Sequence, residues 1–250
     1  MKLRALRRDR AARIGPELFL FERVFDDCLD RVALVNRRFD RALLIGCPDA
    51  AWPERLRTIV PNVDVRDPGP LFAAAADGAP IVEDSWEPPA QAYDLVLAVG
   101  TLDTVNDLPL ALRLIRFAMT SDALFIGAIS GGDTLPQLRA AMRAADLLSG
   151  IAAPHVHPRI DASALSPLLD DAGFVRPVVD VDRLEASYPS LQRLVADLRA
   201  MGATNILSAR APPLNRAQLG AAERAFAGDE GRTTESFQLL HFAAWTPAGG

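Results

Sequence analysis

Two hydrophobic periodicities alternate along the first half of the chain, and this alternation constrains the fold more than any other feature. Apolar residues recur at helical spacing between residues 17 and 36, and a continuous apolar run follows over residues 41–46. Short apolar runs that end at glycine or at turn residues are typical of buried parallel strands. The same exchange of periods continues to residue 129, which predicts an α/β domain built on a parallel sheet.

Five strands are expected in this half, each separated from the next by a helix or a loop. They cover residues 41–46, 62–67, 80–84, 93–100 and 123–129. The second half is more helical, with apolar stripes over residues 134–148, 163–172, 190–201 and 216–227. Two further strands are predicted there, over residues 175–181 and 237–245. Together these segments predict a sheet of seven strands.

Composition limits the classes of protein to which the chain can belong. Its 250 residues are enough for one large domain, or for a core domain with a cap. The net charge of -5 argues against nucleic-acid binding, and no apolar run is long enough for a membrane span. No signal-peptide pattern opens the chain, and Cys28 and Cys47 have no disulfide or metal-site spacing. We therefore expect a cytoplasmic protein without a metal site.

The first 13 residues are strongly basic, with Lys2, Arg4, Arg7, Arg8, Arg10 and Arg13. Such a run can contact an anionic membrane surface or an acidic partner, or can form a targeting helix. Asp9 interrupts it, so the favoured interpretation is a solvated and partly frayed terminus. On this basis residues 1–36 form a basic segment and a helix, and residues 37–250 form the main domain.

The residues at the ends of the predicted strands carry the functional signal, because ligands of open parallel sheets bind at the carboxyl ends of strands. Gly46 ends the first strand, and Asp67 ends the second, 21 positions later. An acid at that distance can accept hydrogen bonds from both ribose hydroxyls of an adenosine cofactor. A carboxylate of the Glu83-Asp84 pair, which ends the third strand, can hold the adenine amino group.

Gly100 ends the fourth strand, where the reactive end of such a cofactor would lie. The joint order of glycine, acid, acid and glycine predicts an adenosine site. The alternative for each acid alone is a helix cap or a solvated turn residue.

Several short motifs in the second half of the chain resemble one known family. They are VNDLP at 105–109, GGDTL at 131–135, PHV at 154–156 and DLRAMGATN at 197–205. These segments resemble the mitochondrial complex I assembly factor five family, and the similarity runs from about residue 40 to the end. More distantly, the chain is similar to the malonyl-carrier-protein methyltransferase of biotin synthesis.

The resemblance implies a Rossmann-like, seven-stranded methyltransferase fold with helical cap insertions within residues 131–210. It implies S-adenosyl-L-methionine as the cofactor and a role in maturing respiratory NADH dehydrogenase, one subunit of which would be the protein substrate. The animal member is described as hydroxylating an arginine. The cofactor-binding residues that we predict are Gly46, Cys47, Asp67, Asp84, Ser85 and Gly100.

The same resemblance suggests substrate contacts for Asn106, Asp107, Gly132, Asp133, His155 and Asn205. Asn106 and Asp107 equally fit the start of the helix that follows them. Asp133 is interpreted first as a cap of the next helix. His155 is interpreted as a residue of loop packing or substrate contact rather than as a metal ligand.

The chain departs from the family pattern at the cofactor loop. Leu44 replaces an acid, and Pro48 and Ala50 replace the two later glycines. Proline has no backbone N–H to offer a cofactor carboxylate. Asp103-Thr104 stands where the family has His-Trp, and no catalytic residue is assigned. Two hypotheses follow: a methyltransferase that acts on a protein, and a non-catalytic relative that serves as an assembly or binding factor.

Overall fold

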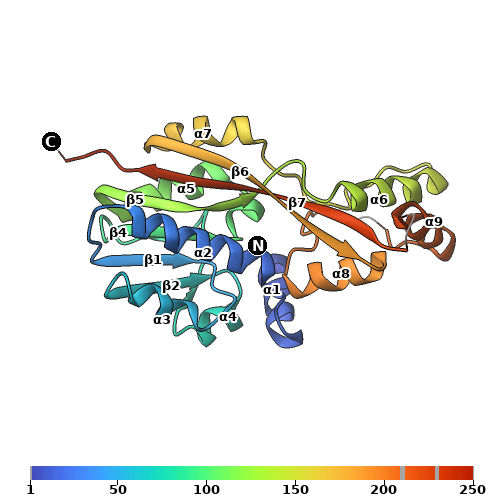
Figure 1. Cartoon of the computed structure of the whole chain (residues 1–250), viewed down its shortest axis with the longest axis horizontal. Coiled ribbons are helices and arrows are strands. Elements are labelled where there is room, and N and C mark those ends of the chain that lie inside the picture. The colour runs from blue at the N-terminus through green and yellow to red at the C-terminus, as the bar shows by residue number, and fades with distance from the viewer. Residues whose placement is uncertain (1, 209–211, 229–230, 250) are drawn as a thin grey trace.

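The computed structural model describes residues 2–208, 212–228 and 231–249 and is built around one seven-stranded sheet (Figure 1). The strand order is β3-β2-β1-β4-β5-β7-β6. Strands β1 to β5 pair in parallel, whereas β7 is antiparallel to both β5 and β6. The strands are β1 (Arg41–Ile45), β2 (Asn62–Asp67), β3 (Ala79–Pro80), β4 (Tyr93–Val99), β5 (Met119–Ser130), β6 (Val175–Tyr188) and β7 (Thr233–Trp245). The predicted α/β class and seven strands are confirmed.

Helices cover both faces of the sheet and extend beyond one end of it. They are α1 (Lys2–Ile14), α2 (Phe19–Leu34), α3 (Trp52–Arg57), α4 (Pro70–Ala75), α5 (Leu108–Ala118), α6 (Pro136–Ser149), α7 (Ala162–Asp171), α8 (Leu191–Ala200) and α9 (Arg216–Phe226). A short 3-10 helix spans Leu102–Thr104. Asp107 caps α5 by accepting a hydrogen bond from the Leu110 amide, as one of the two interpretations of Asp107 predicted.

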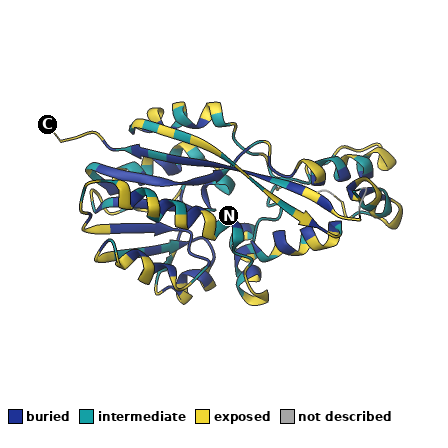
Figure 2. Ribbon diagram, in the orientation of Figure 1, coloured by how far each residue is buried: buried dark blue, intermediate teal, exposed yellow. Residues whose placement is uncertain are grey.

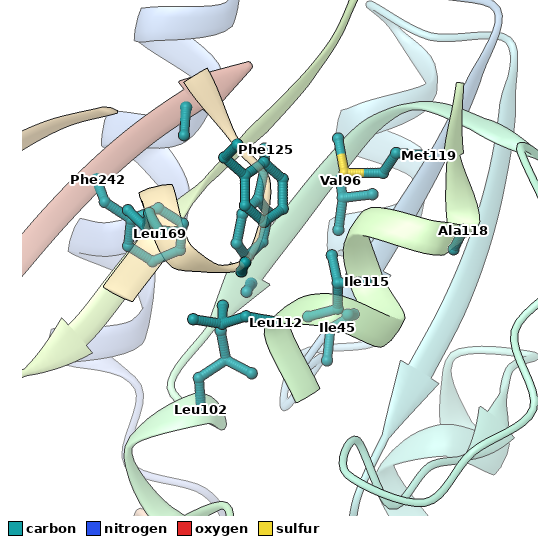
Figure 3. Packing of buried hydrophobic residues seen from close by; sticks show 14 of the residues in the cluster. Ile45, Val96, Leu102, Leu112, Ile115, Ala118, Met119, Phe125, Leu169 and Phe242 are labelled. Carbon is teal, nitrogen blue, oxygen red and sulfur yellow. The ribbon is translucent and has the colours of Figure 1, made fainter. Parts of the chain in front are cut away.

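Two cores explain why the central strands are continuously apolar. In β1, Ala42 and Leu44 face α2 and α3, while Leu43 and Ile45 face the side covered by α5 and α7. Figure 3 shows the second core, where Phe125 and Phe242 of the sheet pack near Leu169 of α7. Both faces of the central strands are therefore buried, as the dark blue strands in Figure 2 show.

A cap is built at the far end of β6 and β7, which continue past the sheet toward α6 and α9 (Figure 1). Residues from α6, α8, α9 and the strand ends share a third core that contains Leu138, Leu194, Phe226 and Phe237. Helix α9 lies beyond the predicted cap range of 131–210, and residues 209–211 lie outside the described residues. The cap therefore includes an element that follows the predicted range.

The third strand and the start of α6 differ from expectation. The strand was predicted over 80–84, but β3 contains only Ala79–Pro80, and the carboxylate of Glu83 binds an arginine instead. The prediction that Asp133 caps α6 is wrong, because its carboxylate contacts Arg183. Glu235 of β7 accepts hydrogen bonds from the first amides of α6 instead.

The prediction of a frayed N-terminus is also wrong. Residues 2–14 form α1, and the side chains of Arg4 and Arg8 are buried. The physical reason is a pair of buried acids that bind these arginines, described below. Among the described residues, no helix has the length and apolarity that crossing a bilayer requires.

We predict that Gly46→Ala destabilises the fold by roughly 3 kcal/mol or more. Gly46 has a φ of +88°, and a Cβ there would lie 2.1 Å from the Val99 carbonyl oxygen. Gly150→Ala is the matched control, because Gly150 has a φ of +67° with open space around it. It should cost only about 1 kcal/mol of strain. Urea unfolding of both variants measures the difference, and equal losses would contradict the steric argument.

Candidate functional site

Asp67, at the carboxyl end of β2, is the centre of the site. Its carboxylate is fully buried and accepts hydrogen bonds from the Cys47 amide at 2.8 Å and the Gly69 amide at 2.7 Å. These two amides belong to the loops that follow β1 and β2. Asp67 therefore joins the two loops that end the neighbouring strands, a structural role that the sequence did not indicate.

Arg8 of α1 supplies the counter-charge of Asp67. Its Nε donates to Oδ1 at 2.7 Å and its Nη2 donates to Oδ2 at 2.5 Å, so the pair is bidentate. Only 4% of Arg8 is exposed, and Asp67 is 0% exposed. Burial lowers the pKa of this guanidinium, but Asp67 outweighs it and holds the pKa above its usual value. The guanidinium and the carboxylate thus form a buried ion pair.

Arg4, one helical turn earlier, repeats this arrangement with Glu83. Its guanidinium donates to the two carboxylate oxygens at 2.5 and 2.7 Å and to the Thr101 carbonyl at 2.5 Å. Arg4 is 3% exposed and Glu83 is 0% exposed. Because positions four apart lie on one face of a helix, a single face of α1 binds both acids.

Helix α1 packs between α4 and α8, where two glycines leave room for it (Figure 1). A Cβ at Gly69 would lie 2.7 Å from the Arg8 Cβ, and one at Gly202 would lie 3.3 Å from the Arg8 Cα. Side chains at these two positions would push the helix outward. Gly69 and Gly202 therefore allow α1 to pack closely on two sides.

The position above Gly100 is filled as well. The Phe21 ring of α2 lies so close that a Cβ at Gly100 would be 2.2 Å from it. The cavity that remains beside Arg4, Arg8 and Gly100 has a volume of about 60 Å³. Ligand pockets usually measure roughly 300–1,000 Å³, so this space holds only a few waters.

The site offers the chemical groups that an adenosine cofactor needs but not the space for it. The carboxylates of Asp67 and Glu83 are the acceptors that ribose hydroxyls and an adenine amino group require, and they lie at the expected edge of the sheet. The space beside them is taken by α1, whose arginines occupy both carboxylates. With α1 in place, the residues do not fit the group.

Other predicted cofactor residues lie in different surroundings. Asp84 accepts a hydrogen bond from the Asp107 amide at 3.0 Å, and the Ser85 amide donates to the Val82 carbonyl. Of the two neighbouring acids, the structure thus brings Glu83 to Arg4 beside the Arg8–Asp67 pair and directs Asp84 toward α5. Cys47 contributes its backbone amide rather than its thiol to the site.

The predicted substrate residues divide into two groups. His155 and Asn205 line one groove in the cap, with a volume of about 490 Å³. Asn106 and Asp107 are exposed at the start of α5, Gly132 lies beside Asp161, and the Asp133 amide donates to Gln238 of β7. His155 contacts Asp146 at 2.8 Å, and among the described residues no group of three metal-ligating side chains occurs.

Sequence reasoning did not assign Arg4 and Arg8 to the site. The available signal was the spacing of four between two arginines, together with two acids at predicted strand ends. A third pair at the same cavity was also missed: Arg159 donates to Asp103 at 2.5 Å. By the resemblance, Asp103 stands where the family carries histidine, so a partly buried ion pair occupies that place.

Comparison with known proteins now defines the family. A family described as a methyltransferase domain matches residues 17–176. The chain belongs to the methyltransferase-domain family. It is 31% identical over 249 residues to the mitochondrial arginine-hydroxylase NDUFAF5 of Danio rerio, which covers 92% of this chain and 75% of that protein.

More distant similarities agree with this family. The chain is 30% identical over 158 residues to the malonyl-[acyl-carrier protein] O-methyltransferase of Xylella fastidiosa, covering 62% of this chain and 52% of that protein. The YcgJ protein of Bacillus subtilis has the same fold, with a TM-score of 0.61 at 11% identity over 90% of this chain and 99% of that one. The Rossmann-like methyltransferase fold and the resemblance found in the motifs are confirmed. One relative is named a hydroxylase and another a methyltransferase, so family membership does not fix the reaction.

We predict that the Cys47 thiol resists alkylation at pH 8. Burial, with the Asp67 charge, raises the pKa of Cys47 to about 12. Since the thiolate is the reactive form, its fraction at pH 8 is roughly a thousandfold below that of a free thiol of ordinary pKa. Mass spectrometry after iodoacetamide treatment measures this, with urea-unfolded protein as the control. Rapid labelling of Cys47 in the folded protein would contradict the buried position of the loop.

Proposed function

We propose that this protein is a maturation factor for respiratory NADH dehydrogenase that binds a protein subunit and works with its cofactor cleft closed. The motif resemblance to the complex I assembly factor five family supports the pathway. The similarity to the arginine-hydroxylase NDUFAF5 supports a protein as the class of substrate. The observation that carries the closed cleft is the double ion pair of α1 with Asp67 and Glu83. A protein in this form corresponds to the non-catalytic hypothesis.

Three features support this choice over an open enzyme. The arginines satisfy both carboxylates within hydrogen-bonding distance, the Phe21 ring covers Gly100, and Pro48 removes an amide from the loop. Removing one partner of a buried ion pair costs about 3–5 kcal/mol, because the other charge stays uncompensated. A cofactor that binds here has to replace α1 and meet that cost through its own contacts.

Methyl transfer from S-adenosyl-L-methionine is the second candidate, and the preservation of both acids favours it. If α1 withdraws, Asp67 would hold the ribose and Glu83 the adenine, and Gly46 would allow the close approach of the loop. The cofactor would supply an electrophilic methyl group, while the protein would contribute binding and alignment.

A reducing compartment such as the cytoplasm is part of the proposal. Both cysteines, Cys28 and Cys47, are free and buried. Buried free thiols without a disulfide partner suit a compartment where thiols remain reduced.

Calorimetric titration distinguishes the two candidates. For the wild type we expect no binding heat at about 1 mM S-adenosylmethionine, a concentration that detects even weak sites. The double variant Arg4→Gln, Arg8→Gln frees both acids, and Arg13→Gln is the control on the exposed part of the same helix. Micromolar binding by the wild type contradicts the closed cleft. Binding by the double variant alone supports a cleft that α1 closes reversibly. Adding Asp67→Ala to the double variant should then weaken cofactor binding by roughly 1–3 kcal/mol.

The maturation role is tested in the source organism. Deletion should lower the amount of assembled NADH dehydrogenase, as native gels and subunit mass spectrometry measure. The wild-type gene and the Asp67→Asn variant should both restore assembly, because the proposed role needs no cofactor. Normal assembly in the deletion strain would refute the role, and failure of Asp67→Asn, if it is as stable as the wild type, would favour the enzyme.

A further inference from the structure

The cap contains an open groove that the cofactor cleft does not use. It lies between α6 and α8 and has a volume of about 490 Å³, well within the range of ligand sites. Apolar side chains form much of its lining: Leu138, Met142, Val156, Leu191, Val195 and Leu214. Such a surface binds bulky apolar groups by excluding water.

Positive charge surrounds this apolar lining. Arg7 and Arg10 come from α1, Arg199 from the last turn of α8, and Arg159 from the loop before α7. Among the described residues that line the groove, none is acidic. The whole chain has a net charge of -5, so a cationic groove is a local departure from its average surface.

Several of these cations have no counter-charge in the described part of the chain. Arg159 pairs with Asp103, but no ion pair involving described residues includes Arg7, Arg10 or Arg199. The Nε atom of Arg7 is buried and has no hydrogen-bond partner among the described residues. A buried donor without a partner is costly, and an anionic ligand would satisfy it.

The composition of the groove selects among anionic ligands. Among the described residues that line it there is no Phe, Tyr or Trp, the side chains on which single-stranded nucleic acids mainly stack. Apolar pockets with cations above them match a polypeptide that carries carboxylates beside bulky apolar side chains. A protein partner is also what the proposed function requires, and the inference rests on that function in this respect.

We infer that the cap groove binds a segment of the partner protein in which acidic side chains lie beside bulky apolar ones on one face of a helix. The apolar side chains enter between α6 and α8. The carboxylates meet Arg7 and Arg10 on one side and Arg199 on the other. Arg4 and Arg8 bind the two acids of the cofactor cleft, whereas Arg7 and Arg10 of the same helix line the groove. Helix α1 therefore borders both sites.

The test uses the full chain and a labelled synthetic peptide of about twelve residues, with leucine and glutamate at helical spacing. A second peptide carries lysine in place of glutamate, and phosphatidylglycerol vesicles are the third probe. Fluorescence anisotropy should show binding of the glutamate peptide only. Raising the salt concentration should weaken it, because the rim charges are exposed.

Variants locate the binding. Arg10→Glu with Arg199→Glu should weaken the glutamate peptide at least about tenfold, since two attractions become repulsions. Leu219→Ser, at the exposed edge of the groove, should weaken it about fivefold through lost apolar contact. Arg113→Glu, an exposed arginine of α5 outside the groove, is the matched control and should leave affinity unchanged.

Three results would overturn the inference: equal binding of both peptides, unchanged affinity in the Arg10→Glu, Arg199→Glu variant, or binding of vesicles without binding of the glutamate peptide. The outcome is separable from that of the proposed function. If the protein binds the glutamate peptide but the deletion strain assembles NADH dehydrogenase normally, the groove is supported and the maturation role is refuted. Full complementation by the Arg10→Glu, Arg199→Glu variant, although it no longer binds the peptide, would retain the maturation role and show that the partner does not bind through this groove.

Discussion

Two buried arginine–carboxylate pairs determine how the rest of this structure is organised. Arg8 with Asp67 and Arg4 with Glu83 attach the N-terminal helix to the carboxyl edge of the sheet, the edge at which open parallel sheets bind ligands. Such pairs add little net stability relative to apolar packing, but each member is costly to leave alone. The pairs therefore make α1 and the two acids a single unit that stays together or separates together.

The fold was predictable because its signals are local. Buried parallel strands need apolar side chains on both faces, and amphipathic helices need one stripe, so each element can be identified within its own residues. Gly46 and Asp67 were identified for the same reason, since each ends an element. The prediction chose Asp84 rather than Glu83. The sequence could not show that Glu83 is the acid beside Arg4, because neighbouring side chains point in different directions and β3 ends before both.

The function of the basic segment was not predictable in this way. A run of arginines has the same local pattern in a solvated tail and in a buried helix. Arg8 and its acid are 59 positions apart, and Arg4 and its acid are 79 apart, so only the assembled sheet brings them together. The error over Asp133 has the same origin, because Glu235, which binds the amides of α6, comes from a distant strand.

The helix that closes the cleft lies outside the region by which the family is identified, since that match begins at residue 17. A recombinant fragment cut at this boundary would contain every strand but would leave two interior carboxylates without their guanidinium partners. Such a fragment would attract protons or metal cations to neutralise them, and its ligand affinities would be those of a different molecule. The start point chosen for expression therefore decides which protein is measured.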